Sequence, residues 1–101
     1  CGRVFSATFL VAAHKKRRSE CSLDEKMDLH NIVMLCCVFG CDALYEHGYV
    51  TVGSNGELHV SDACGPVETS YAKNVMLNRI SVAEAESQYF AWHFARHCRT
   101  E

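Results

Sequence analysis

The chain has 101 residues, of which 49% are hydrophobic, so it can form one small domain with its own core. This apolar content and a formal net charge of only −2 exclude a disordered segment and give no overall attraction to nucleic acid. No apolar run is as long as a membrane span, so we expect no membrane partner.

The first half of the chain predicts a strand, a short helix and a second strand. The run "TFLVAAH" (8–14) favours a strand that ends at His14, and a dense basic cluster follows it at once: Lys15, Lys16, Arg17 and Arg18. "SLDEKMDLH" (22–30) predicts a short helix, with Ser22 and Glu25 as a capping box. "NIVMLCC" (31–37) is a β-branched apolar run, which predicts a buried strand starting at Asn31.

The second half predicts a short helix, a hairpin and a longer final helix. Residues 43–46 favour a helix that stops at Gly48, and "YVTVGSNGELHV" (49–60) is two alternating strands around a turn. Residues 62–80 contain the only proline and predict an irregular connection with a short strand or helix. Ser81 and Glu84 form a second capping box, before a helix with a wide apolar face: Ala85, Tyr89, Phe90, Trp92, Phe94 and Cys98.

The seven cysteines indicate metal binding more than disulfide bonds. An odd number does not suggest a closed set of secreted disulfides, so we expect an intracellular protein, cytoplasmic or nuclear. The pair Cys36-Cys37, with Cys41 four residues further on, looks like half of a metal site. Cys64 and Cys98 are isolated, and we interpret both as ordinary packing residues.

Four motifs, taken in order, resemble the HNH endonuclease family, in the subgroup with an "AAHI" strand end. They are "AAHK" (12–15), "NIVML" (31–35), "DALYEHG" (42–48) with the hairpin after it, and "YFAWHFARHCR" (89–99). The likeness spans nearly the whole chain. It implies an α+β fold with a ββα-metal (HNH-like) core, an added β-hairpin and a C-terminal helix. Because the sequence begins with Cys1 and not Met, we expect residues 1–101 to be one domain of a longer chain.

The resemblance assigns catalytic roles to three residues. His14 would be the general base, because a neutral imidazole accepts a proton near working pH, and Asn31 would orient it or shape the site. The third motif position is normally a histidine that binds metal, but Asp42 stands there. A carboxylate suits Mg²⁺ or Mn²⁺, so Asp42 would be the ligand of a catalytic metal. His47 is a nearby substitute imidazole, although its spacing on a short helix points it elsewhere.

A structural zinc site is also implied, because many members of the family hold zinc with two cysteine pairs. "CGR" at the start looks like the second half of such a pair, so Cys1 would be one ligand. The second pair would be Cys37 and Cys41, or Cys36 and Cys41. Cys21 is a candidate fourth ligand or a plain loop cysteine. A closed zinc site would stabilise a domain of this size.

These observations lead to three hypotheses. The first is a metal-dependent endonuclease domain that hydrolyses DNA phosphodiester bonds, with phosphates held by the basic cluster of Lys15, Lys16, Arg17 and Arg18. The second is a catalytically degenerate HNH-like zinc domain that only binds nucleic acid or protein, which the Asp42 substitution favours. The third is a zinc-knuckle interaction domain without nuclease ancestry, which the hairpin and final helix do not favour. Target recognition is expected elsewhere in the parent chain.

Overall fold

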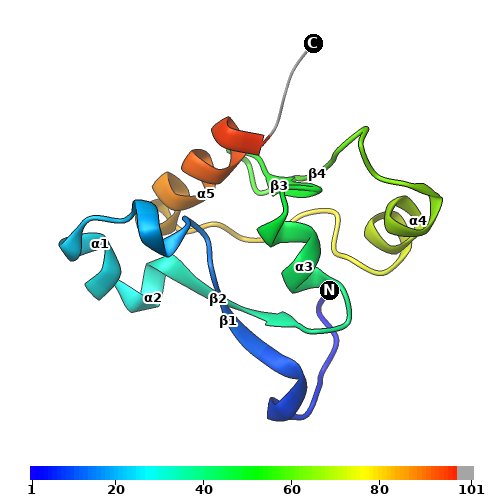
Figure 1. Ribbon diagram of the computed structural model, residues 1–101, viewed down its shortest axis with the longest axis horizontal. Coiled ribbons are helices and arrows are strands. Elements are labelled where there is room, and N and C mark those ends of the chain that lie inside the picture. The colour runs from blue at the N-terminus through cyan, green and yellow to red at the C-terminus, as the bar shows by residue number, and fades with distance from the viewer. Residues whose placement is uncertain (98–101) are drawn as a thin grey trace.

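A computed structural model describes residues 1–97 and has two small antiparallel sheets surrounded by helices, an α+β architecture (Figure 1). The elements in chain order are β1 (Leu10–His14), α1 (Leu23–Met27), α2 (Leu29–Ile32), β2 (Val33–Cys37), α3 (Cys41–Glu46), β3 (Val50–Val52), β4 (Leu58–Val60), α4 (Pro66–Asn74) and α5 (Glu84–His97). Within residues 1–97, no helix has the length and apolar composition that a membrane crossing requires.

The first sheet pairs β1 with β2 and separates two chemically different ends. In its antiparallel register His14 lies opposite Val33, while Leu10 lies opposite Cys37. Four residues of strand span about 13 Å at the usual rise, so the two ends are far enough apart to carry separate sites. The histidine end and the cysteine end of one short sheet therefore form the frame for the two candidate sites.

The core lies between α3, the second sheet and α5. Strand β3 is fully buried, with Val50 only 1% exposed, because α5 and α3 both pack against it. Tyr45 of α3 and Phe90 of α5 meet edge to face, with ring centroids 6.3 Å apart. Figure 1 shows α3 near the middle of the molecule, with α5 beside the β3–β4 hairpin. Helix α3 therefore holds the two sheets together.

Gly48 lets the chain turn sharply from α3 into β3. Its φ of 77° is in the left-handed region, which L side chains rarely adopt, and an added Cβ would collide with the His97 ring. The predicted stop at Gly48 is confirmed, and the reason includes close approach of α5 as well as backbone conformation.

Two predicted element starts were wrong, whereas one was confirmed. Ser22 caps α1 with Glu25 as predicted, through reciprocal hydrogen bonds of 3.2 and 2.8 Å. Helix α5 starts at Glu84, not just after Ser81, because the carboxylate that caps its first turn is that of Glu86. Asn31 lies in the helical turn α2 and not at a strand start, since the ladder with β1 begins only at Val33.

Residues 62–80 and the final apolar face also differ in detail from the prediction. A regular helix, α4, begins at Pro66, where proline is well tolerated, and ends at Asn74. On α5 the fully buried side chains are Tyr89, Phe90 and His93, while Ala85 is exposed. The predicted packing role of Cys98 lies outside the described residues.

Candidate functional site

A cavity of about 390 Å³ lies where β1, α3 and α5 meet, and His14 and Asp42 both line it. Other hollows on the described chain are of similar size, so chemistry and not volume singles this one out. We call it the histidine cavity. Its lining residues are Val11, Ala12, Ala13, His14, Arg17, Arg18, Ser19, Asp42, Tyr45, Glu46, Trp92, His93 and His97. The base and the acidic ligand predicted from sequence are thus brought together by the first sheet and α3.

Two carboxylates of α3 face this cavity. Asp42 is in the first turn of α3 and Glu46 is four residues later, a spacing that puts both side chains on one helix face. Burial raises the pKa of the Asp42 carboxyl, and the negative charge of Glu46 raises it further. Two acids held together in this way favour a bound cation. Sequence reasoning missed Glu46, although its spacing from Asp42 was a signal.

His93 contributes a third group to the cavity. Its Nε2 lies 2.7 Å from the carbonyl oxygen of Tyr45, and this acceptor fixes the proton on Nε2. Its Nδ1 is buried and has no hydrogen-bond partner among the described residues. Burial lowers the pKa of His93 to about 4, so the ring is neutral at pH 7. His93 therefore donates a hydrogen bond from α5 to α3, while its Nδ1 has no partner among the described residues.

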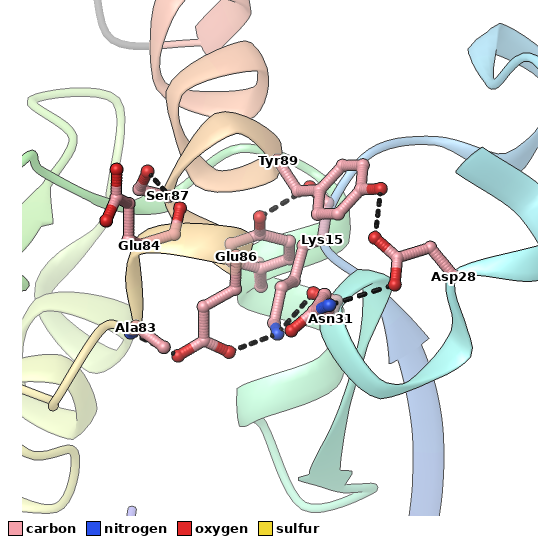
Figure 2. A network of polar contacts seen from close by, with 9 residues as sticks. Lys15, Asp28, Asn31, Ala83, Glu84, Glu86, Ser87 and Tyr89 are labelled. Atoms are coloured by element: carbon pink, nitrogen blue, oxygen red, sulfur yellow. Dashed lines mark hydrogen bonds and ion pairs between the residues drawn. The ribbon is translucent and has the colours of Figure 1, made fainter. Parts of the chain in front are cut away.

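Lys15 is a structural residue. It is 3% exposed, and its Nζ lies 2.7 Å from Glu86 Oε2 and 2.6 Å from the Asn31 carbonyl oxygen. Figure 2 shows the ammonium between α5 and α2, inside a network that also contains Tyr89 and Asp28. Burial of this kind does not favour the predicted contact with nucleic acid, because a phosphate cannot reach the charge.

The Asn31 side chain is turned toward its own loop. Its amide nitrogen donates to Asp28 Oδ1 at 2.9 Å, and the other carboxylate oxygen of Asp28 accepts from the Tyr89 hydroxyl at 2.7 Å (Figure 2). These hydrogen bonds hold the Asp28 pKa below its usual value. Asn31 is not among the residues that line the histidine cavity. Asn31 therefore stabilises the segment between β1 and β2 and does not contact the histidine cavity.

The other three residues of the basic cluster differ in their contacts within residues 1–97. Lys16 lies 2.9 Å from Glu25 and over the Trp92 ring, at 5.9 Å from its centroid. Arg17 and Arg18 are exposed and line the histidine cavity. Of the four predicted phosphate contacts, these two arginines are therefore the ones positioned beside His14.

The predicted cysteine cluster is present at the other end of the first sheet. The sulfurs of Cys1, Cys37 and Cys41 all lie within 4.8 Å of one another. Cys37 ends β2 and Cys41 begins α3, so the three-residue turn between them brings both thiols to one point. Thiolates at this spacing can hold a soft or borderline ion such as zinc. It is the only group of three such donors among residues 1–97, which means that no ready three-ligand cluster exists in the histidine cavity.

The two alternative zinc ligands predicted from sequence, Cys36 and Cys21, lie outside the cysteine cluster. Cys36 is buried and packs near the cluster without joining it, and burial raises its thiol pKa to about 12. Cys21 packs with Ile32 and Tyr89 instead, and its Sγ contacts the carbonyl oxygen of Arg17 at 3.3 Å. The structure thus selects Cys37 over Cys36 and leaves Cys21 as a plain loop cysteine.

Two residues that the sequence did not suggest surround the cysteine cluster. The Tyr71 hydroxyl of α4 lies 3.4 Å from the Cys37 Sγ and 3.5 Å from the Cys41 Sγ. Arg3 donates to the Tyr71 hydroxyl at 2.8 Å and to the Cys1 Sγ at 3.3 Å. Burial alone would raise the pKa of Cys37, but hydrogen bonds from Tyr71 and Cys41 bring it down to about 6. The surroundings of Cys37 therefore favour the thiolate form of this residue, which is the form that binds metal.

No family model matches the chain, and no curated protein is significantly similar to it. Functional conclusions therefore rest on the geometry of the two sites.

Proposed function

We propose that the chain is an HNH-type endonuclease domain that hydrolyses DNA phosphodiester bonds, with His14 as general base. The observation that carries the proposal is that His14, Asp42 and the two exposed arginines, Arg17 and Arg18, share one cavity, although they come from β1, the segment after it and α3. The antiparallel pair of β1 and β2, followed by the short helix α3, is also the order of elements that a ββα-metal core would need.

The chemistry follows from these groups. His14 accepts a proton from a water molecule as that water attacks phosphorus, which is the general-base role that histidine fills most often in enzymes. Arg17 and Arg18 hold neighbouring phosphates and fix the register of the strand without reading its sequence. Asp42, with Glu46 beside it, would hold a divalent ion, which would supply positive charge where the leaving oxygen becomes negative. One or two carboxylates suffice for Mg²⁺, whose remaining positions are filled by water and phosphate.

A degenerate binding module is the second candidate, and one observation favours it. Asp42 and Glu46 place negative charge in the cavity that a phosphate must enter. Without a cation, this charge keeps a phosphate out of the cavity and prevents cleavage. The domain would then only bind nucleic acid or protein. The two candidates therefore differ in whether the acidic pair holds a metal.

A plasmid-nicking assay with Mg²⁺, Mn²⁺ or EDTA separates them. We expect His14→Ala to lower the rate by roughly 10²- to 10⁴-fold with nearly unchanged metal affinity, because a base contributes to the rate and not to ion binding. His30→Ala is the matched control, since His30 is exposed on α2 and does not line the cavity. Equal nicking by the parent and His14→Ala would reject the proposed base.

Substitution of Asp42 tests the metal. We expect Asp42→Ala to weaken ion binding and to recover part of its activity at high Mn²⁺, while Asp42→His retains activity with a shifted metal preference. If Asp42→Ala cleaves like the parent at every metal concentration, Asp42 is not a ligand. If the parent never cleaves but Asp42→His does, the domain is a degenerate module.

Salt dependence tests the arginines. Each lost phosphate contact reduces the slope of log K against log salt by about 0.9 for duplex DNA. The double variant Arg17→Gln/Arg18→Gln should therefore bind DNA more weakly and with a slope smaller by about two. An unchanged slope would place the DNA elsewhere on the domain.

A further inference from the structure

The cysteine cluster consists of three sulfurs, and a tyrosine hydroxyl contacts two of them. A structural zinc site is almost always tetrahedral with four protein ligands, so three thiolates leave one vertex to be filled. Among the described residues, no fourth cysteine, histidine or carboxylate joins the group. The Tyr71 hydroxyl lies within 3.5 Å of two of the three sulfurs, those of Cys37 and Cys41.

The distances from the Tyr71 oxygen to two of the sulfurs match the edges of a tetrahedral zinc site. With Zn–S bonds of about 2.3 Å and a Zn–O bond of about 2.0 Å, a tetrahedral sulfur-to-oxygen edge is about 3.5 Å long. The Tyr71 oxygen lies 3.4 Å from the Cys37 Sγ and 3.5 Å from the Cys41 Sγ. The sulfur-to-sulfur edge of the same tetrahedron is about 3.8 Å, which lies within the 4.8 Å spread of the cluster.

We propose that Tyr71 is the fourth protein ligand of a zinc ion held by Cys1, Cys37 and Cys41. This inference concerns a structural site and does not depend on the proposed nuclease activity, because the histidine cavity shares no residue with it.

Charge also fits a ligand set of three thiolates and one phenolate. Four anionic ligands around a dication leave a net charge of −2, the same as in a four-cysteine site. Here the guanidinium of Arg3 lies against the set, 2.8 Å from the Tyr71 oxygen and 3.3 Å from the Cys1 Sγ. It reduces the net charge to −1. Its N–H groups also hydrogen-bond outer lone pairs of the ligands, as outer-shell partners do in metal sites.

The backbone around the site is shaped for the tyrosine ring. A Cβ on Gly40 would lie 2.8 Å from the Tyr71 Cζ, closer than any side chain tolerates. Glycine in the turn between Cys37 and Cys41 therefore leaves the space through which the ring reaches the thiols. Tyr71 is also the link that ties α4 to the first sheet, so a metal bound here would join three distant parts of the chain.

The primary experiment needs no variant. Protein with one equivalent of zinc, checked by elemental analysis, is compared with the zinc-free protein by near-ultraviolet difference spectroscopy. We expect a phenolate band, because coordination removes the hydroxyl proton to solvent. Failure to bind one equivalent of zinc, or stoichiometric binding without that band, would overturn the inference.

The second experiment uses Tyr71→Phe, which removes only the oxygen, with Tyr49→Phe as matched control. Tyr49 is partly exposed and has no contact with the cluster. We expect Tyr71→Phe to abolish the band, to change the visible spectrum of the Co²⁺-substituted protein, and to weaken zinc binding by more than the roughly 10- to 100-fold that loss of an outer hydrogen bond costs. Tyr49→Phe should keep all three properties. An unchanged Co²⁺ spectrum and an unchanged zinc affinity in Tyr71→Phe would overturn the assignment.

Discussion

Replacing Glu86 by glutamine would leave the Lys15 ammonium inside the protein without its counter-ion. Lys15 is 3% exposed, and its Nζ is 2.7 Å from Glu86. After the change, its remaining partners would be the Asn31 carbonyl oxygen at 2.6 Å, the neutral oxygen of the new amide and the Phe90 ring at 5.2 Å. None of these carries a negative charge, so the lysine would be left as an uncompensated buried charge.

The size of the effect follows from the burial of each partner. Removal of one member of a buried ion pair costs about 3 to 5 kcal/mol, and the remaining amide oxygen places Glu86→Gln at about 3 kcal/mol. Lys15→Met should cost less, about 1 kcal/mol, because the Glu86 carboxylate is 21% exposed and still accepts from the Ala83 N–H at 2.8 Å. The two partners of one bond should therefore have unequal effects on the free energy of unfolding.

Urea denaturation and thermal unfolding of the single variants and of Lys15→Met/Glu86→Leu measure this difference. For a domain of this size 1 kcal/mol corresponds to about 4–8 °C in Tm, so we expect losses of about 12 °C or more for Glu86→Gln and about 4–8 °C for Lys15→Met. The double variant should be more stable than Glu86→Gln, because it removes the buried charge. Lys15→Met should also keep the DNA affinity of the parent. Equal losses in the two single variants, or a large loss of DNA binding in Lys15→Met, would refute the reasoning.

Three further predictions concern pH, backbone and metal. His93 has a pKa of about 4 in the folded protein against 6.5 when free, so the unfolded chain binds the extra proton between these values, and stability present at pH 7 is lost as pH falls toward 4. Denaturant titrations at pH 7 and pH 5 should differ by about 2 kcal/mol from this group alone, and the variant His93→Gln should lack that part of the difference. Gly48→Ala should destabilise the fold by at least about 1 kcal/mol in the same titration, since it combines a left-handed φ with a collision against the His97 ring; a neutral result would contradict that close approach. Chelation of a zinc-loaded sample should lower Tm by several degrees or more, because metal binding is linked to folding; an unchanged melting curve after confirmed metal loss would count against zinc in the cysteine cluster.

Local chemistry made several features predictable from the sequence. The capping box of Ser22 and Glu25 closes within four residues, so it forms wherever the helix forms. The hairpin around residues 53–56 and the convergence of Cys37 and Cys41 likewise depend on short spans of chain. His14 at a strand end beside the helix that carries Asp42 followed from the order of motifs. In the capping box, the hairpin and the Cys37–Cys41 turn, the residues that interact are close in sequence, whereas His14 and Asp42 were placed together by the resemblance.

Only the tertiary structure decided which polar groups are free and which are used. Lys15 and Lys16 look alike in sequence, yet Lys15 is buried because α5 brings Glu86 to it across 71 residues, a pairing that no local pattern encodes. Long separation in sequence also hid Tyr71 from the cysteine cluster and His93 from the histidine cavity. Buried charges and unpartnered nitrogens depend on contacts between segments far apart in the chain, whereas caps, turns and cysteine spacing do not. The sequence by itself therefore determined the elements and the donor types, and the packing of α4 and α5 decided which residues complete each site.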